Sequence, residues 1–236
     1  MLSSVPEAAP EEDSRMLEKL AQAVIRGDVA GAKDFTRAAL EASVPPARII
    51  ADGLIGGMDV VGKKFREGSM FMPEVLLSAR AMHQAMDIVK PLVAAGDLGV
   101  AGKVVIGTVK GDLHDIGKKL VTMMLQGAGF EVLDLGVDVG PERFVAAVRE
   151  DGANVVAMSA MLTTTMVQMI TVVRALEQAG LRERVKVIVG GAPVTDEFAT
   201  EIGADRYGSD AAEAVEITRS LLNGQAVSRE TSPAAV

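Results

Sequence analysis

The chain has 236 residues, of which 49% are hydrophobic, 24% charged and only 3% aromatic. This composition is that of a globular protein, so a collagen-like or wholly disordered chain is excluded. The sequence contains no cysteine, which excludes disulfides, thiolate metal sites and cysteine nucleophiles, and its two histidines are too few for a site of several imidazoles. A net charge of −8 argues against nucleic acid as a partner, because nucleic-acid-binding surfaces are basic.

The two ends of the chain differ in composition from the rest. Residues 1–13 are acidic and rich in proline and alanine, and they lack the basic and apolar regions of a secretory signal. We expect these residues and the tail 228–236 to be disordered. No uncharged apolar run reaches the roughly 18 residues that a membrane-spanning helix needs. A cytoplasmic protein with no membrane partner is therefore expected.

Residues 14–93 have the periodicity of amphipathic helices. Leu17, Leu20, Ala21 and Val24 recur at i, i+3, i+4 and i+7, the spacing that places apolar side chains on one helix face. Glycines and prolines separate such stretches, and helices are predicted from residue 15 to the break at Gly27, over 30–43, over 46–67 and over 73–93. Four helices joined by short breaks predict an antiparallel bundle.

Residues 94–102 are small and glycine-rich, which predicts a linker, and the pattern changes after them. In residues 103–227 short β-branched runs alternate with amphipathic stretches. The predicted strands are 103–109, 131–135, 154–159, 185–189 and 205–207, and the predicted helices are 117–127, 141–152, 162–180, 195–202 and 211–223. This alternation predicts an α/β domain with a flavodoxin-like, Rossmann-type sheet of five parallel strands in the order 2-1-3-4-5.

Three loops of the predicted sheet are candidates for a binding site. In open parallel sheets ligands bind beyond the carboxyl ends of the strands, beside the point where the strand order reverses. The loops that follow the first, third and fourth strands are 110–117 (KGDLHDIG), 159–165 (SAMLTTT) and 190–193 (GGAP). All three are rich in glycine, hydroxyl or ionisable residues, and the predicted strand order brings them together.

The first of these loops holds a carboxylate and an imidazole two residues apart. An extended backbone would direct Asp112 and His114 to the same side. A carboxylate bound to one ring nitrogen fixes the tautomer and leaves the other nitrogen available to a metal. These residues alone leave three interpretations open: a loop histidine that caps a helix, a general base oriented by Asp112, or a metal ligand. Gly117 allows close approach at the start of the next helix.

These motifs together resemble those of a known family. GDLHDIG resembles the Asp-x-His-x-x-Gly motif of cobalamin-binding domains, and 41 residues then separate Gly117 from Ser159. A Ser-x-Leu element and a Gly-Gly pair complete the family's pattern; here the pair is Gly190-Gly191, and Met161 replaces the usual leucine. Residues 52–91 are similar to the helical cap that precedes this domain in methionine synthase and in the corrinoid proteins of methyltransferase systems.

The resemblance implies a cofactor site. In the family the cobalamin loses its own lower base (base-off) and takes a protein histidine, which His114 matches, with Asp112 as its hydrogen-bonded partner. His114 would thus be the cobalt ligand and the sole metal ligand from the protein. The resemblance implies further cofactor contacts from Gly111, Asp115, Ile116, Gly117, Ser159, Leu162, Thr163, Gly190, Gly191 and Tyr207. Phe65 and Met72 match positions over the upper face of the corrin.

The resemblance also implies a function and partners. The protein would carry a methyl group on cobalamin between a substrate-specific methyltransferase and a second, acceptor methyltransferase, for example one that serves tetrahydrofolate. A reductive activating protein would be a third partner. The chain would be a carrier subunit without catalytic residues of its own, because it has no segment of the size of a substrate-binding barrel. A cobalamin-dependent regulatory or sensor module is the alternative, although such sensors carry an additional DNA-binding domain.

The remaining marked residues have ordinary structural explanations. Lys110, Lys118 and Lys119 are expected to be solvated surface lysines. Thr164 and Thr165 stand at the start of a predicted helix, where a capping role is expected. His83 lies between apolar positions of the fourth predicted helix, and we expect it to have a structural or surface role.

Overall fold

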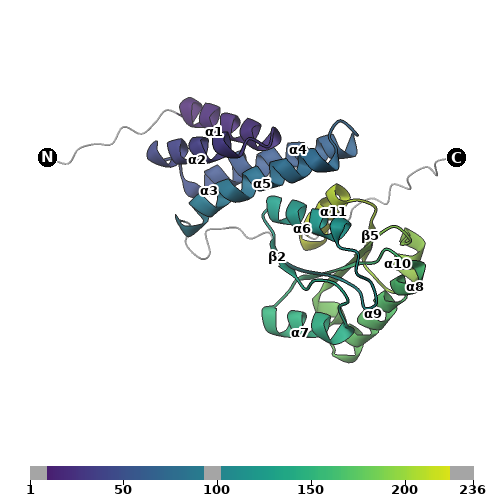
Figure 1. The fold of residues 1–236 in the computed structure, drawn as a ribbon. Helices are drawn as coiled ribbons and strands as arrows, with labels where there is room; N and C mark the ends of the chain where they lie inside the picture. Colours follow the sequence, from purple (N-terminus) through teal and green to yellow (C-terminus); the bar gives the residue numbers. More distant parts are fainter. Residues whose placement is uncertain (1–9, 93–101, 224–236) are drawn as a thin grey trace. The chain divides into compact units, whose positions relative to one another are not determined.

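The computed structural model describes residues 10–92 and 102–223 (Figure 1). The described chain forms two compact units. One, called the helical unit below, consists of residues 10–92 with Lys119–Glu131, and the other consists of residues 102–118 and 132–223. The predicted linker lies outside the described residues except for Gly102, as do residues 1–9 and 228–236, which were predicted to be disordered. The prediction is wrong for residues 10–13, which belong to the first helix because their acidic side chains suit a helix N-terminus.

Helices account for the first part of the chain. They are α1 (Pro10–Ile25), α2 (Val29–Glu41), α3 (Pro46–Arg48), α4 (Gly56–Arg66) and α5 (Met72–Val89), with a π-helical segment (Ile49–Ile55) between α3 and α4 and a 3-10 turn (Lys90–Leu92) after α5. The third predicted helix is thus continuous but changes its hydrogen-bonding pattern within the segment Ile49–Ile55. No helix of the described ranges is long and apolar enough to cross a membrane.

The helices pack closely because small residues of one face the apolar stripe of another. Leu20 and Val24 of α1 are fully buried, as the periodicity predicts. A Cβ atom added at Gly53 would lie 2.6 Å from Leu20 Cδ2, and one added at Gly57 would lie 3.0 Å from Val24 Cβ. The two glycines therefore allow α1 to approach the π-helical segment and α4 more closely than any larger residue would.

The second part of the chain forms the predicted parallel sheet. Its strands are β1 (Lys103–Thr108), β2 (Glu131–Asp134), β3 (Val155–Ser159), β4 (Lys186–Gly190) and β5 (Arg206–Gly208), and their order β2-β1-β3-β4-β5 confirms the prediction. The helices are α6 (Ile116–Gly127), α7 (Pro141–Asp151), α8 (Thr163–Met166), α9 (Gln168–Gln178), α10 (Asp196–Glu201) and α11 (Ala211–Asn223). The predicted helix over 162–180 is divided at Val167 into α8 and α9.

The core of the sheet is built from buried strand residues and the helices that cover them. Phe144 of α7 is fully buried, and a Cβ atom added at Gly107 of β1 would lie 2.9 Å from its Cζ. The glycine therefore leaves room for the ring directly on the strand. Helices α7 and α9 lie together against one face of the sheet (Figure 1).

The strand register brings the three candidate loops to one edge. Thr108 pairs with Ser159, Ser159 with Gly190, and Gly190 with Gly208. Because these residues are the last or nearly the last of their strands, the loops that follow begin at the same level. The site is therefore assembled at the carboxyl edge of β1, β3 and β4.

The glycine pair after β4 is held against the neighbouring backbone. Gly191 has φ +124°, and a Cβ atom there would overlap the carbonyl oxygen of Ala160. A Cβ atom at Gly190 would lie 2.9 Å from the carbonyl oxygen of Gly208. At these two glycines one backbone lies directly against another, and a larger residue would force β4 away from its neighbours.

We predict that Gly191→Ala lowers the free energy of unfolding by about 3 kcal/mol or more, because it adds both backbone strain and overlap with Ala160. Gly152→Ala is the matched control, since Gly152 also has positive φ (+68°) but has open space around its Cβ position. Its expected cost is about 1–2 kcal/mol. Urea unfolding of the three proteins measures both values, and equal costs would contradict the close approach at Gly191.

Candidate functional site

A buried carboxylate stands at the centre of the site. Asp112 follows β1 and is 0% exposed. Its Oδ1 accepts a hydrogen bond from the backbone N–H of His114 (3.0 Å) and lies 2.7 Å from His114 Nδ1. Its Oδ2 accepts from the backbone N–H of Met161 (2.8 Å) and from the hydroxyl of Thr165 (2.6 Å). Each carboxylate oxygen therefore accepts two hydrogen bonds, and the donors belong to two of the three loops.

These hydrogen bonds keep the carboxylate ionised. Burial raises the pKa of Asp112, but the hydrogen bonds from Thr165, from the N–H of Met161 and from His114 outweigh burial and hold it well below its usual range. Each of these donors stabilises the charged form more than the neutral form. Asp112 therefore presents a full negative charge to the imidazole of His114 at neutral pH.

The imidazole of His114 is oriented by this charge. Its side chain is 56% exposed, and its Nδ1 faces Asp112. An ionised carboxylate can only accept, so Nδ1 carries the proton and Nε2 presents its lone pair. Among the described residues nothing is hydrogen-bonded to Nε2, and the carbonyl of His114 accepts from the hydroxyl of Thr108 (2.9 Å). The imidazole ring is thus hydrogen-bonded to Asp112, whereas the backbone of His114 is hydrogen-bonded to Thr108 of β1.

Thr165 belongs to this site, although the sequence predicted a capping role for it. It lies in α8, is buried, and donates to Asp112 from 53 residues further along the chain. Its hydroxyl also lies 3.0 Å from the carbonyl oxygen of Leu162. The prediction is wrong because three consecutive threonines carry no signal of which one turns toward the first loop. Thr163 and Thr164 are exposed.

Exposed apolar side chains lie in the first two loops of the site. Leu113 and Ile116 are each 72% exposed, and Met161 and Leu162 of the second loop are also exposed. Large apolar side chains in these numbers at a single sheet edge are unusual on a protein surface and indicate a binding surface. Their chemistry suits a large, mainly apolar ring.

The other predicted site residues are distributed as follows. Ser159 and Gly190 are paired at the ends of β3 and β4, and Tyr207 pairs with Val189 one residue before the end of β5. Burial, followed by the carboxylates of Glu213 and Asp210, raises the pKa of Tyr207. Gly111, Asp115 and Gly117 lie in the first loop or at the start of α6, whereas Phe65 and Met72 belong to α4 and α5 of the helical unit.

Lys118 corrects another expectation. It was predicted to be a solvated surface lysine, but it is 3% exposed and its Nζ forms an ion pair with the carboxylate of Asp134 at the end of β2. Asp134 also accepts from the N–H of Gly136 (2.8 Å). The prediction is wrong because the first turn of α6 directs this position toward the sheet. Lys110 and Lys119 are exposed, as predicted.

The site suits a cofactor that brings most of its own metal ligands. The described residues contain no group of three or more His, Asp or Glu side chains that could hold a metal ion. His114 offers one imidazole nitrogen. A Cβ atom added at Gly117, three residues further along the chain, would meet nothing within 4 Å. The chemistry of the donor set therefore fits a metal carried in a macrocycle.

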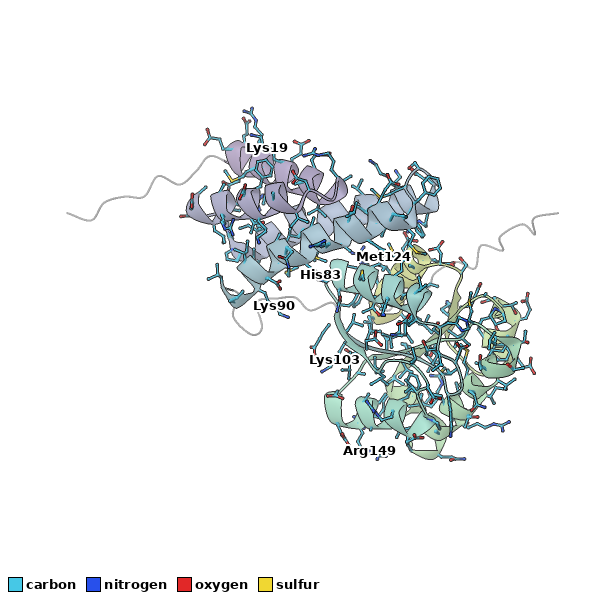
Figure 2. All side chains as sticks on the ribbon, in the orientation of Figure 1. Lys19, His83, Lys90, Lys103, Met124 and Arg149 are labelled. Atoms are coloured by element: carbon cyan, nitrogen blue, oxygen red, sulfur yellow. The ribbon has the colours of Figure 1, made fainter. Side chains whose placement is uncertain are left out.

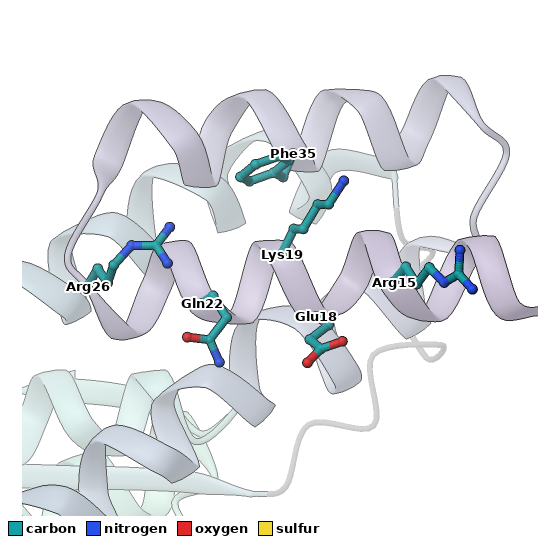
Figure 3. Close-up of a pocket in the computed structure, with 6 residues that line it drawn as sticks. All are labelled: Arg15, Glu18, Lys19, Gln22, Arg26 and Phe35. Carbon is teal, nitrogen blue, oxygen red and sulfur yellow. The ribbon is translucent and has the colours of Figure 1, made fainter.

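Two further features lie in the helical unit. His83 is half-buried on α5 (Figure 2), and burial lowers its pKa, opposed in part by the carboxylate of Asp87. A shallow groove of about 360 Å³ lies between α1 and α2, where Lys19 extends beside the ring of Phe35 (Figure 3). The residues that line it are Arg15, Glu18, Lys19, Gln22, Arg26 and Phe35, none of which is a predicted site residue.

The fold and the site together define a cobalamin-binding protein. A family model described as a B12 binding domain matches residues 102–216, and a second model of the same description matches residues 16–90. The chain is 42% identical to trimethylamine corrinoid protein 1 of Methanosarcina acetivorans, over 88% of this chain and 97% of that protein. It is 39% identical to a corrinoid protein of Desulfitobacterium hafniense over the same shares. The chain belongs to the family of corrinoid proteins of methyltransferase systems.

Solved structures agree with this assignment. A methanol:cobalamin methyltransferase complex of Methanosarcina barkeri contains a chain with 32% identity and a TM-score of 0.81, covering 92% of this chain and 85% of that one. A cobalamin-binding protein of Desulfitobacterium hafniense has 34% identity and a TM-score of 0.72, covering 85% of this chain and 96% of that one. The helical part and the parallel sheet of this chain therefore occur together in corrinoid proteins.

We predict that Thr165→Val raises the pKa of Asp112, because it removes a donor to the charged form, whereas Thr165→Ser leaves it unchanged. The lost hydrogen bond should cost about 1.5–3 kcal/mol of stability at neutral pH. The depressed pKa stabilises the fold above the unfolded value of about 4, and this contribution is lost as pH falls through the folded value. The cost should therefore shrink in acid. Carboxyl-carbon NMR titration and urea unfolding at several pH values measure both effects.

Proposed function

We propose that this protein carries a methyl group on cobalamin between two methyltransferases. The observation that carries the proposal is the His114 ring, which is held at Nδ1 by the buried Asp112 carboxylate and presents Nε2 beside exposed apolar side chains. A carrier needs a ligand that holds the cofactor in a fixed orientation. The oriented imidazole of His114 supports this role.

The relatives support a small methylated compound as the methyl donor. Two relatives are named as trimethylamine and dimethylamine corrinoid proteins, and the chain in the methanol:cobalamin complex has the same fold. We infer that a separate methyltransferase binds the donor and that a second one binds the acceptor, for example tetrahydrofolate. A reductive activating protein would restore the cofactor after oxidation.

The residues of the first loop would hold the cofactor from below. His114 Nε2 would be the lower axial ligand in a base-off arrangement, and the Asp112 charge on Nδ1–H would make Nε2 a stronger donor. When bound, the cofactor supplies the cobalt that accepts and releases the methyl group. Gly111, Asp115, Ile116 and Gly117 would contact the cofactor around this ligand.

The second and third loops would hold the tail of the cofactor. Ser159 ends β3 and is followed by Leu162 and Thr163, and Gly190 ends β4 and is followed by Gly191. Hydroxyls there can bond to a phosphate or a base, and the glycines allow close approach. Tyr207 on β5 would extend this surface. Phe65 and Met72 would shield the upper face of the corrin, with residues 14–93 acting as a cap domain and residues 103–227 as the cofactor domain.

We predict that His114→Ala abolishes nitrogen ligation of cobalt while the protein still folds, because the ring is exposed and buries little apolar surface. The measurement is electron paramagnetic resonance of ¹⁵N-labelled protein loaded with unlabelled cobalamin with cobalt in the +2 state, in which a protein nitrogen and the nitrogen of the cofactor's own base split the signal differently. His83→Ala is the control that removes the other histidine and should retain the splitting by the protein nitrogen. Splitting by a protein nitrogen that persists in His114→Ala would overturn the ligand assignment.

Asp112→Asn should retain the fold but weaken the axial ligand. The amide cannot supply the negative charge that Nδ1–H faces, and loss of such a partner costs about 10–100-fold in metal affinity or activity. We expect a reduction of that size in methyl-transfer rate together with a shifted cobalt reduction potential. The control is Asp151→Asn, an exposed carboxylate at the end of α7. An unchanged rate and potential in Asp112→Asn would reduce Asp112 to a structural residue of the loop.

A further inference from the structure

The loop that follows β2 contains a residue in an unusual backbone conformation. Asp138 has φ +53°, and it shares a positive φ with only one other non-glycine residue of the described ranges, Ser43. An L-residue in the left-handed region costs about 1–2 kcal/mol, although aspartate tolerates this region better than most. A conformation of this kind persists only where the surrounding contacts hold it.

The contacts of Asp138 lead directly to the first loop of the site. Its carboxylate Oδ1 accepts a hydrogen bond from the backbone N–H of Gly111 (2.7 Å). Its own N–H donates to the backbone carbonyl of Asp112 (3.0 Å). Asp138 therefore binds the Gly111–Asp112 segment through one donor and one acceptor, 26 residues away in sequence. It makes no hydrogen bond to His114 within the described residues.

The residues on both sides of Asp138 are hydrogen-bonded to the end of β1. On one side of it the N–H of Thr108 donates to the carbonyl of Gly136 (3.0 Å), and on the other the N–H of Val139 donates to the carbonyl of Thr108 (2.9 Å). Val139 also forms an isolated parallel bridge with Val109. These bonds fix both flanks of residue 138 to the end of β1.

The backbone of the segment that Asp138 holds has few other hydrogen bonds, although the Asp112 side chain is fully bonded. Gly111 has φ +82°. Besides the two contacts with Asp138, the backbone of Gly111 and Asp112 makes one further hydrogen bond, from the N–H of Asp112 to the carbonyl of Val109 (3.1 Å). Without the Asp138 carboxylate the Gly111 N–H would lose its partner, while the Asp112 carbonyl would keep the backbone N–H of residue 138. A glycine so released can rotate more freely, and its rotation would strain the hydrogen bonds that join the Asp112 carboxylate to His114 and Thr165.

We propose that Asp138 is a positioning residue that sets the direction of the Asp112–His114 pair and, through it, the axial coordination of the cofactor. This inference rests on the proposed function, since it assigns Asp138 a role behind the His114 ligand. Its carboxylate acts on the backbone of the loop and touches neither the imidazole nor the space beside it. The residue is exposed, so an ordinary turn aspartate is the alternative that the experiment must distinguish.

Three substitutions distinguish the effect of the Asp138 carboxylate from the effect of its backbone conformation. Asp138→Asn keeps an Oδ1 acceptor and tolerates positive φ, Asp138→Gly keeps the conformation but removes the acceptor, and Asp138→Ala removes the acceptor and disfavours the conformation. Ser43→Ala is the matched control, because it changes a residue of similar φ (+62°) in the helical unit. A turn aspartate would predict that the glycine variant behaves like the parent.

The first measurement uses the full chain without cofactor. Amide hydrogen exchange by NMR reports the Gly111 N–H, and we expect exchange to accelerate at least about tenfold in Asp138→Gly and to stay within about twofold of the parent in Asp138→Asn. Gly111 protection that is unchanged in Asp138→Gly would overturn the inference. The measurement does not depend on the cofactor or on its ligand.

The second measurement uses the protein loaded with cobalamin. We expect the fraction of molecules with splitting by a protein nitrogen in the paramagnetic resonance signal to fall in Asp138→Gly and further in Asp138→Ala, and cobalamin affinity to fall about 10-fold or more. Asp138→Asn and Ser43→Ala should match the parent. If Asp138→Ala does not fold, the Asn and Gly variants provide the test.

The outcomes separate this inference from the proposed function. A parent protein with no splitting by a protein nitrogen would show that the proposed ligation is wrong, while Gly111 exchange would still test the hold of Asp138 on the loop. A parent with splitting that persists undiminished in all three Asp138 variants would overturn the positioning role and leave His114 as ligand.

Discussion

The structure of the site depends on one requirement, that the buried carboxylate of Asp112 be fully hydrogen-bonded. A carboxylate without partners in a buried position would cost several kcal/mol or take up a proton. Its donors come from its own loop and from the loop after β3, so β1 and β3 must end, and the two loops begin, at the same level of the sheet. The β1–β3 register, in which Thr108 pairs with Ser159, meets this requirement. The strand register therefore places the donors that keep Asp112 ionised.

The two sides of the site are made rigid by different means. Around His114 the loop is held by polar contacts to Asp112, Thr108 and the strand beside it. Around Gly191 the chain is held by close packing of one backbone on another, with no side chain between them. The first arrangement gives a ring nitrogen a fixed direction, and the second leaves a smooth edge. A cofactor with a metal centre and a long polar tail needs both properties.

The sequence predicted the elements and the strand order because each element carries its own period, and alternation of strands and helices permits few topologies. Asp112 and His114 were predictable because they lie within one short motif. Thr165, Asp138 and Lys118 were not, because their roles depend on contacts with segments 53, 27 and 16 residues away. The break at Val167 and the π-helical segment were also missed. Both are shifts of local hydrogen bonding that leave the apolar pattern almost unchanged.

The exposed side chains of Leu113, Ile116, Met161 and Leu162 have a consequence for the behaviour of the purified protein. They present to water an apolar surface through which two molecules can associate, and in the proposed complex the corrin would cover it. The net charge of −8 opposes such self-association by mutual repulsion. Colloidal stability should therefore be poorest in acid and in concentrated salt, and preparations saturated with corrinoid should tolerate these conditions better than empty ones.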